Sequence, residues 1–212
     1  RGFPKMKHIA IIIASGLLAA GTFAKDKEGW TPLFNGKNLD GWETCVFGGD
    51  GVISVEDGSL SMALGEALTG VRYTGKKIPK VDYEIALSGR RVSGNDFFCG
   101  LTFQVGDKPC SLILGGWGGT VCGLSNLDTF DASENETTTY QNFEAEKWYK
   151  VRLRVTKTHV KAWLDDKKIV DVDISAKAIS IRPEVELSLP FGIAAWQTHS
   201  ELRDIRFRSL KK

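Results

Sequence analysis

The alternation of apolar and polar side chains across residues 95–127 restricts the fold more than any other feature of this sequence. Apolar residues recur at every second position of segment 97–105. A similar pattern continues in segments 110–114 and 120–124, after glycine-rich turns. A period of two is the period of a β-strand with one buried face. The three segments therefore predict an antiparallel meander with one face in the core.

The predicted core face of this meander carries its large apolar side chains. Pairing Val105 with Cys110 across the turn at residues 106–109 places apolar residues of both strands on one face. The residues expected to be buried there are Phe97, Leu101, Phe103, Leu112 and Leu114. Small and polar residues such as Thr102 and Ser111 occupy the opposite face, which therefore has room for a ligand.

Trp117 stands between two pairs of glycines at the rim of this polar face. An indole ring can stack on the C–H face of a sugar while polar groups of the sheet bind its hydroxyls. In a second interpretation, residues 115–119 form only a tight turn and Trp117 packs on the core. The sequence does not decide between the two.

The rest of the chain repeats the strand pattern. About a dozen strand-like segments are separated by Gly, Asn and Asp turn residues. Residues 81–88 alternate in the same way, which predicts that Glu84 faces away from the core. Helical periodicity is almost absent, and at most one short helix is expected, at residues 174–181. The fold class predicted is all-β: a two-sheet antiparallel β-sandwich of the jelly-roll type.

Residues 1–24 have the pattern of a secretory signal peptide with a few residues upstream of it. A basic residue follows Met6, residues 9–18 are largely apolar, and small residues precede Ala24. The apolar run is too short to span a bilayer as a stable helix, although a retained membrane anchor is the alternative. We therefore expect residues 25–212 to form a single exported domain, periplasmic or extracellular.

The expected mature chain is close to neutral. The whole sequence has 28 basic and 26 acidic residues, for a net charge of +2. Removal of residues 1–24 takes away Arg1, Lys5 and Lys7, which leaves 25 basic and 26 acidic residues and a net charge of −1. This balance argues against nucleic acid, or a membrane after signal removal, as the main partner. It leaves the oligomeric state open.

The four cysteines, Cys45, Cys99, Cys110 and Cys122, are expected to be buried free thiols. Export would permit disulfides, and four cysteines allow three pairings, but the predicted register sets no two of them directly opposite one another. No C-x-x-C motif or histidine cluster accompanies them, so no metal site is predicted.

Several phrases carry a family resemblance over nearly all of the chain after residue 24. They are FNGKNLDGW (34–42), VEDGSL (55–60), VDYEIALSGR (81–90), WYKVRLRV (148–155), AWLDDKKIVDV (162–172) and LRDIRFRSL (202–210). In these phrases the chain resembles the 3-keto-disaccharide hydrolase family, whose fold is a concanavalin A-like jelly roll.

The resemblance implies an exported hydrolase or lyase that cleaves the glycosidic bond of a 3-keto glycoside. The ketone at C3 acidifies the C2 proton, a base removes it, and the glycosidic oxygen leaves before water is added. Such chemistry needs a base, an acid for the leaving group and a group that polarises the ketone. Segment 110–114 lacks the carboxylate and amide of many family members, so no catalytic residue is transferred there.

Three residues are candidates for catalysis. Glu134 and Glu136 share a face if their segment is extended, and His199 follows Trp196 near the end of a late strand. A histidine can act as a base near neutral pH. The alternative interpretations are a solvated acidic loop for the two glutamates and a surface histidine at a turn for His199.

Candidate substrate-binding residues lie beside Trp117 in this scheme. Asp128 and Asp131, in the polar segment after the meander, are hydroxyl acceptors, while Asp96 and Arg91 precede the meander. Arg91 is equally consistent with an exposed strand end. Asn126, Asp128 and Asp131 offer oxygen ligands for calcium, but their spacing matches no strong motif, so calcium stays an alternative and no cofactor is predicted.

Three functions remain open from the sequence. The first is a carbohydrate-active hydrolase or lyase, the second a non-catalytic, lectin-like glycan-binding module, and the third an exported structural domain without a small ligand. A base and an acid converging on one groove favour the first. An aromatic platform without convergent carboxylates favours the second.

Overall fold

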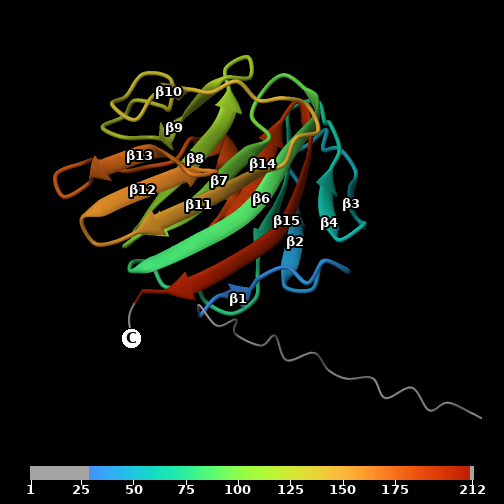
Figure 1. Ribbon diagram of the computed structural model, residues 1–212, viewed down its shortest axis with the longest axis horizontal. Coiled ribbons are helices and arrows are strands. Elements are labelled where there is room, and N and C mark those ends of the chain that lie inside the picture. The colour runs from blue at the N-terminus through green and yellow to red at the C-terminus, as the bar shows by residue number, and fades with distance from the viewer. Residues whose placement is uncertain (1–28, 211–212) are drawn as a thin grey trace, which may run out of the picture.

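Two antiparallel sheets packed face to face make up residues 29–210, the part of the chain that the computed structural model describes (Figure 1). The predicted all-β sandwich is confirmed. The predicted signal peptide, residues 1–24, lies outside the described residues. No helix within residues 29–210 has the length and apolar character needed to cross a membrane.

The first sheet, here called the long-strand sheet, contains the two longest strands, β6 and β15. Its order is β13 (Lys167–Asp173), β12 (His159–Leu164), β11 (Tyr149–Val155), β6 (Tyr83–Gly94), β15 (Thr198–Ser209), β4 (Ser59–Met62) and β3 (Ile53–Glu56), and β1 (Thr31–Pro32) also pairs with β15. Strands far apart in the sequence are therefore neighbours, as in a jelly roll.

The second sheet, here called the meander sheet, contains the three strands predicted from residues 95–127. Its order is β10 (Thr139–Tyr140), β9 (Val121–Ser125), β8 (Lys108–Gly116), β7 (Cys99–Val105), β14 (Gly192–Trp196), β5 (Leu68–Tyr73) and β2 (Trp42–Cys45). All of its pairings are antiparallel.

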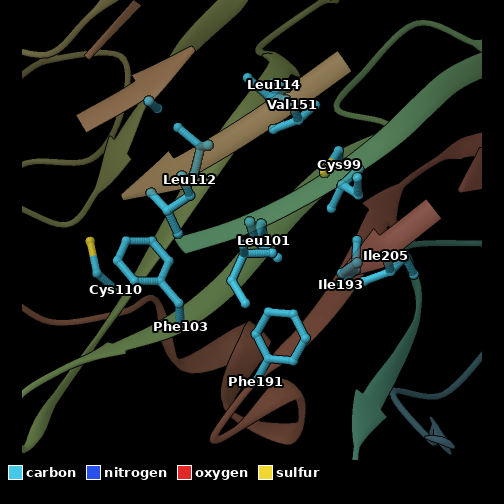
Figure 2. Packing of buried hydrophobic residues seen from close by; sticks show 14 of the residues in the cluster. Cys99, Leu101, Phe103, Cys110, Leu112, Leu114, Val151, Phe191, Ile193 and Ile205 are labelled. Carbon is cyan, nitrogen blue, oxygen red and sulfur yellow. The ribbon is translucent and has the colours of Figure 1, made fainter. Parts of the chain in front are cut away.

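The predicted core face of the meander is confirmed. Leu101, Phe103, Leu112 and Leu114 are fully buried, and Figure 2 shows them packed with Val151 of the long-strand sheet. The predicted register is wrong by two residues, because the turn holds only two residues and Val105 pairs with Lys108. A shift of two keeps every side chain on its predicted face.

The prediction that Phe97 is buried in the core is wrong. Phe98, not Phe97, enters the core, where its ring lies 4.9 Å from that of Phe143. Phe97 is only partly buried and packs on the outer face of the sheet, above Gly100. A Cβ at Gly100 would come within 2.9 Å of the Phe97 ring, so the glycine makes room for it. The alternation therefore breaks just before β7 begins.

Two other expectations have clear outcomes. All four cysteines are buried and free, as predicted. The one helix described within residues 29–210 is the 3-10 helix η1 (Pro183–Ser188), which begins after the predicted position at residues 174–181. Pro183 suits the first turn of a helix because its missing N–H has no intrahelical partner there.

Candidate functional site

A cavity of about 200 Å³ opens on the outer face of the meander sheet. Its lining consists of Leu68, Asp96, Phe97, Ser111, Ile113, Trp117, Ser125, Arg182, Glu184, Val185 and Trp196. This is the polar face that the sequence predicted to have room for a ligand. The volume is below the roughly 300–1,000 Å³ of pockets for drug-sized molecules, so it suits a single ring better than an extended chain.

Small hydroxyl side chains form the floor of the cavity. Ser111 on β8 is paired with Ser125 on β9, and both are buried. The Ser111 hydroxyl lies 3.0 Å from that of Thr102, and the Ser125 hydroxyl donates to the side-chain oxygen of Asn126 at 2.8 Å. These hydroxyl groups of the floor are therefore already hydrogen-bonded to neighbouring side chains.

Trp117 stands at the rim of the cavity and is 42% exposed, so it does not pack into the core. Its backbone adopts a φ of +49°, within a turn that Arg91 supports from inside the sandwich. One terminal nitrogen of Arg91 donates to the carbonyl oxygens of Asp96, Gly115 and Gly119 at 3.0–3.2 Å. Arg91 therefore positions the turn, and it does not line the cavity.

Asp96 lines the cavity and connects the Trp117 turn to the start of the meander. Its Oδ1 accepts the backbone N–H of Phe97 at 2.7 Å, and its Oδ2 accepts that of Gly118 at 3.2 Å. Its own backbone N–H donates to the hydroxyl of Thr198 at 3.1 Å. Its side-chain oxygens can also accept hydrogen bonds from ligand hydroxyls, because Asp96 lines the cavity.

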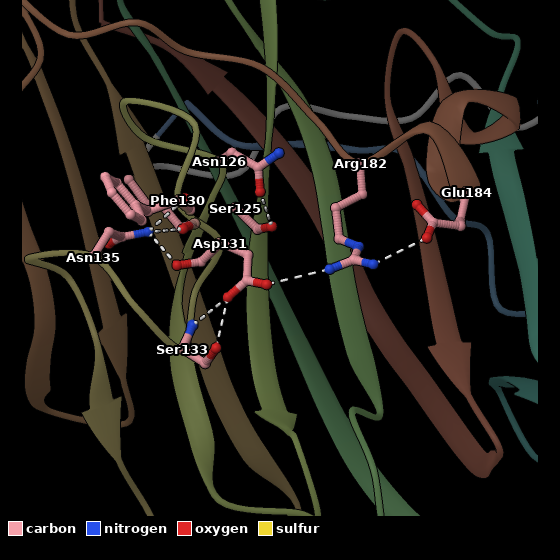
Figure 3. Close-up of polar contacts among 9 residues, drawn as sticks. Ser125, Asn126, Phe130, Asp131, Ser133, Asn135, Arg182 and Glu184 are labelled. Carbon is pink, nitrogen blue, oxygen red and sulfur yellow. Dashed lines mark hydrogen bonds and ion pairs between the residues drawn. The ribbon is translucent and has the colours of Figure 1, made fainter.

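An ion-pair chain borders the other side of the cavity (Figure 3). Arg182 lies 3.2 Å from an Asp131 oxygen and 3.0 Å from a Glu184 oxygen. The hydrogen bond that Arg182 donates to Glu184 lowers the pKa of Glu184 and raises the pKa of Arg182. At neutral pH the cavity therefore has a carboxylate beside a guanidinium, both about half exposed.

The segment at residues 126–142 folds over part of the outer face of the meander sheet, at Gly123 and Ile113. The Asn135 amide donates to the Leu124 carbonyl at 2.7 Å, and the Thr137 hydroxyl accepts the Leu124 N–H at 2.9 Å. Ala132 packs against Ile113 at the edge of the cavity. This segment closes one side of the site with backbone and small side chains.

The carboxylates of that segment do not converge on the cavity. Asp128 accepts from the Ala178 N–H at 2.9 Å and from Lys177 at 3.0 Å, and these contacts, chiefly the first, lower its pKa. Glu136 also pairs with Lys177, and Glu134 is exposed. Asp131 contacts the site only through Arg182.

His199 lies on the long-strand sheet and not beside Trp117. The chain crosses between the sheets at Gln197, which has a φ of +42°, so Trp196 ends β14 and Thr198 begins β15. The His199 Nε2 lies 2.9 Å from the Ser61 hydroxyl of β4. His199 is therefore close to Trp196 in the sequence but does not line the cavity.

No group of three or more His, Cys, Asp or Glu side chains within residues 29–210 is arranged to hold a metal ion. Of the residues considered for calcium, Asp128 and Asp131 are occupied by Lys177 and Arg182.

Sequence reasoning missed Arg182 and Glu184. They belong to a stretch between β13 and β14 that contains η1 and no strand. The useful signal was the length of this stretch, because long connections without strand patterning often carry binding groups.

Residues 29–211 match the family model described as a 3-keto-alpha-glucoside-1,2-lyase-like domain. The chain belongs to this family. A comparison with curated proteins found no significant match. Membership covers the whole sandwich, including both connections that border the cavity.

Solved structures share the fold of this lyase-like domain at low sequence identity. A candidate glycosyl hydrolase from Parabacteroides distasonis is 16% identical with a TM-score of 0.54, over 88% of this chain and 96% of that one. The transglycosylase Crh5 is 9% identical with a TM-score of 0.58, over 86% and 84%. The carbohydrate-binding module CBM66 from Bacillus subtilis is 12% identical with a TM-score of 0.50, over 80% and 96%.

Proposed function

We propose that this lyase-like domain binds one ring of a 3-keto glycoside in the cavity beside Trp117 and cleaves its glycosidic bond. The observation that carries the proposal is the juxtaposition, at one cavity, of an exposed indole, a hydroxyl floor and the Arg182–Glu184 pair. Stacking holds the ring, and the floor and Asp96 accept its hydroxyls. Family membership supplies the reaction class.

In this proposal Arg182 and Glu184 carry the chemistry. Arg182 polarises the C3 ketone and stabilises the enolate that forms when Glu184 removes the C2 proton. The C1–O bond then breaks, and Glu184 returns the proton to the departing glycosidic oxygen. Water adds to the resulting double bond to complete hydrolysis. Glutamate is ionised at neutral pH, and Arg182 lowers the pKa of Glu184 further, so the carboxylate that accepts the proton is present.

The test is a turnover assay of the full chain on a panel of 3-keto glycosides, with and without chelator. Glu184→Gln should lose turnover and retain binding, since the amide keeps the shape but cannot accept the proton. Glu134→Gln is the matched control, because Glu134 is exposed and outside the lining. If Glu134→Gln lost turnover while Glu184→Gln kept full turnover, the catalytic site would lie in residues 126–142 and not beside Arg182.

The second candidate function is a non-catalytic glycan-binding module. The observation that favours it is that Glu134, Glu136 and His199 do not gather with Trp117. The carbohydrate-binding module CBM66 has a similar fold. Glycan binding that depends on Trp117, without turnover of any 3-keto glycoside, would select this function over the first.

Export is part of the proposal and is supported by the sequence pattern of residues 1–24. A carbohydrate-active protein that acts on external glycans needs such a signal.

A further inference from the structure

Stacked tryptophan and arginine side chains cover much of the outer face of the long-strand sheet. The guanidinium carbon of Arg152 lies 3.9 Å from the ring centroid of Trp163. Those of Arg206 and Arg208 lie 5.0 and 4.5 Å from the centroid of Trp30. Stacking on an indole face holds a guanidinium plane in a fixed position.

Trp30 and the three arginines line an open groove of about 540 Å³ on the side of the sandwich opposite the cavity. Strand β6 runs between β11 and β15 (Figure 1) and contributes the small residues Ala86 and Ser88 to the floor. Arg152 of β11 lines one side, and Arg206 and Arg208 of β15 line the other. The result is a trough with a flat floor and basic walls.

The groove has an excess of positive charge. Its basic lining residues are Lys150, Arg152, Arg206 and Arg208, and its acidic ones are Asp165 and Asp204. The expected mature chain has a net charge of −1, so the basic excess is local to this face. A local field of one sign attracts a polymer of the other sign.

Glu84 fixes the arginines at one end of the groove. It faces away from the core, as predicted, yet it is fully buried beneath guanidinium groups. It accepts from Arg154 at 2.6 Å, from Arg208 at 2.5 Å and from Arg152 at 3.3 Å. These contacts pre-organise the basic walls, which lowers the ordering cost of binding. They also show that a carboxylate is a suitable partner for these guanidinium groups.

We propose that this groove is a second carbohydrate site, which binds an acidic polysaccharide through its carboxylates. The planar fork of arginine matches a carboxylate, and the Ala86–Ser88 floor leaves space for a sugar ring. Nucleic acid fits less well because the Trp30 and Trp163 rings are already stacked on arginines. This site does not depend on the proposed lyase cavity.

The test is equilibrium binding of polygalacturonate to the full chain at low and moderate salt, with neutral dextran as the reference. The double variant Lys150→Ala/Arg206→Ala removes one charge from each side of the groove and leaves the hydrogen bonds of Glu84 with Arg154 and Arg208 in place. We expect its affinity to fall about tenfold or more, with a weaker salt dependence.

A matched control removes two charges elsewhere. Arg72→Ala/Lys80→Ala deletes two exposed basic residues, paired with Glu43 and Asp107, and should bind polygalacturonate like the wild type. Ser88→Glu places a negative charge on the groove floor and should also abolish binding. Trp117→Ala should leave this binding unchanged, which separates the groove from the cavity.

Two results would overturn the proposal. One is unchanged polygalacturonate binding in both the double variant and Ser88→Glu. The other is equal or tighter binding of dextran sulfate or duplex DNA, which would show that the groove responds to charge density and not to a carboxylated glycan.

Discussion

Replacing Glu84 with glutamine should destabilise the protein far more than the same change at an exposed glutamate. Glu84 is fully buried and accepts two short hydrogen bonds, from Arg154 on β11 and Arg208 on β15. Glutamine keeps the shape of the side chain but removes the charge, and its NH₂ group faces the guanidinium donors.

The size of this destabilisation follows from how deeply Glu84 and its arginine partners are buried. Removing one partner of a buried ion pair costs roughly 3–5 kcal/mol because the other charge is left unpaired. Here the side chains of Arg154 and Arg208 are 36% and 25% exposed, so both can turn partly toward water. We therefore expect the lower end of that range, about 3 kcal/mol, which corresponds to a decrease in Tm of roughly 6–12 °C for a chain of this size.

The assay is chemical and thermal unfolding of both variants, with Glu43→Gln as the control. Glu43 pairs with Arg72 at 2.7 Å, but its side chain is 54% exposed, so its loss should cost less than about 1 kcal/mol. A free energy of unfolding for Glu84→Gln within about 0.5 kcal/mol of that for Glu43→Gln would refute the reasoning, because burial would then not set the cost.

The remaining predictions concern the core, the thiols, the cavity and export. Phe103→Ala should lower the free energy of unfolding by about 3–5 kcal/mol, because Phe103 is fully buried, and a loss below about 1 kcal/mol would contradict its core position. Burial raises the pKa of Cys99 and Cys110 to about 12, so a thiol reagent at pH 8 should label neither until the chain unfolds. The same shift predicts that the contribution of these two thiols to stability is complete well below about pH 8.5 and is lost as the pH rises toward 12, since the unfolded chain loses these protons first. Trp117→Ala should weaken glycan binding about tenfold or more while leaving the Tm nearly unchanged, because its ring is 42% exposed; unchanged affinity would place the site elsewhere. Intact-mass analysis of secreted protein should show a chain that begins near Lys25, and a mature form that begins at Met6 would contradict export.

The β-sandwich could be predicted from the sequence because a strand buried on one face has apolar residues at every second position. Leu101 and Leu112 could be assigned to the core although the turn was predicted wrongly. The register was wrong by two residues, and a shift of two leaves each side chain on the same face of the sheet. At Phe97 and Phe98 the alternation does not assign a face, since both rings are apolar and either can enter the core. Only the packing above Gly100 decides between them.

The candidate site was partly predictable. The hydroxyl floor and Trp117 lie on strands or tight turns, whose direction follows from alternation and glycine spacing. Arg182 and Glu184 lie in a connection without strand patterning, whose path is set by contacts across the molecule. His199 was misplaced because the corner at Gln197 moves the chain from one sheet to the other within three residues.

The four buried free cysteines have a consequence for where this chain can fold. Its sandwich is held by packing between the sheets, with no covalent cross-link among Cys45, Cys99, Cys110 and Cys122. Folding therefore needs no oxidant and no disulfide isomerase. The same native state should form in a reducing cytoplasm and in an oxidising compartment. Burial both shields these thiols and keeps them protonated. Peroxide and glutathione should therefore react with them only when the sandwich opens.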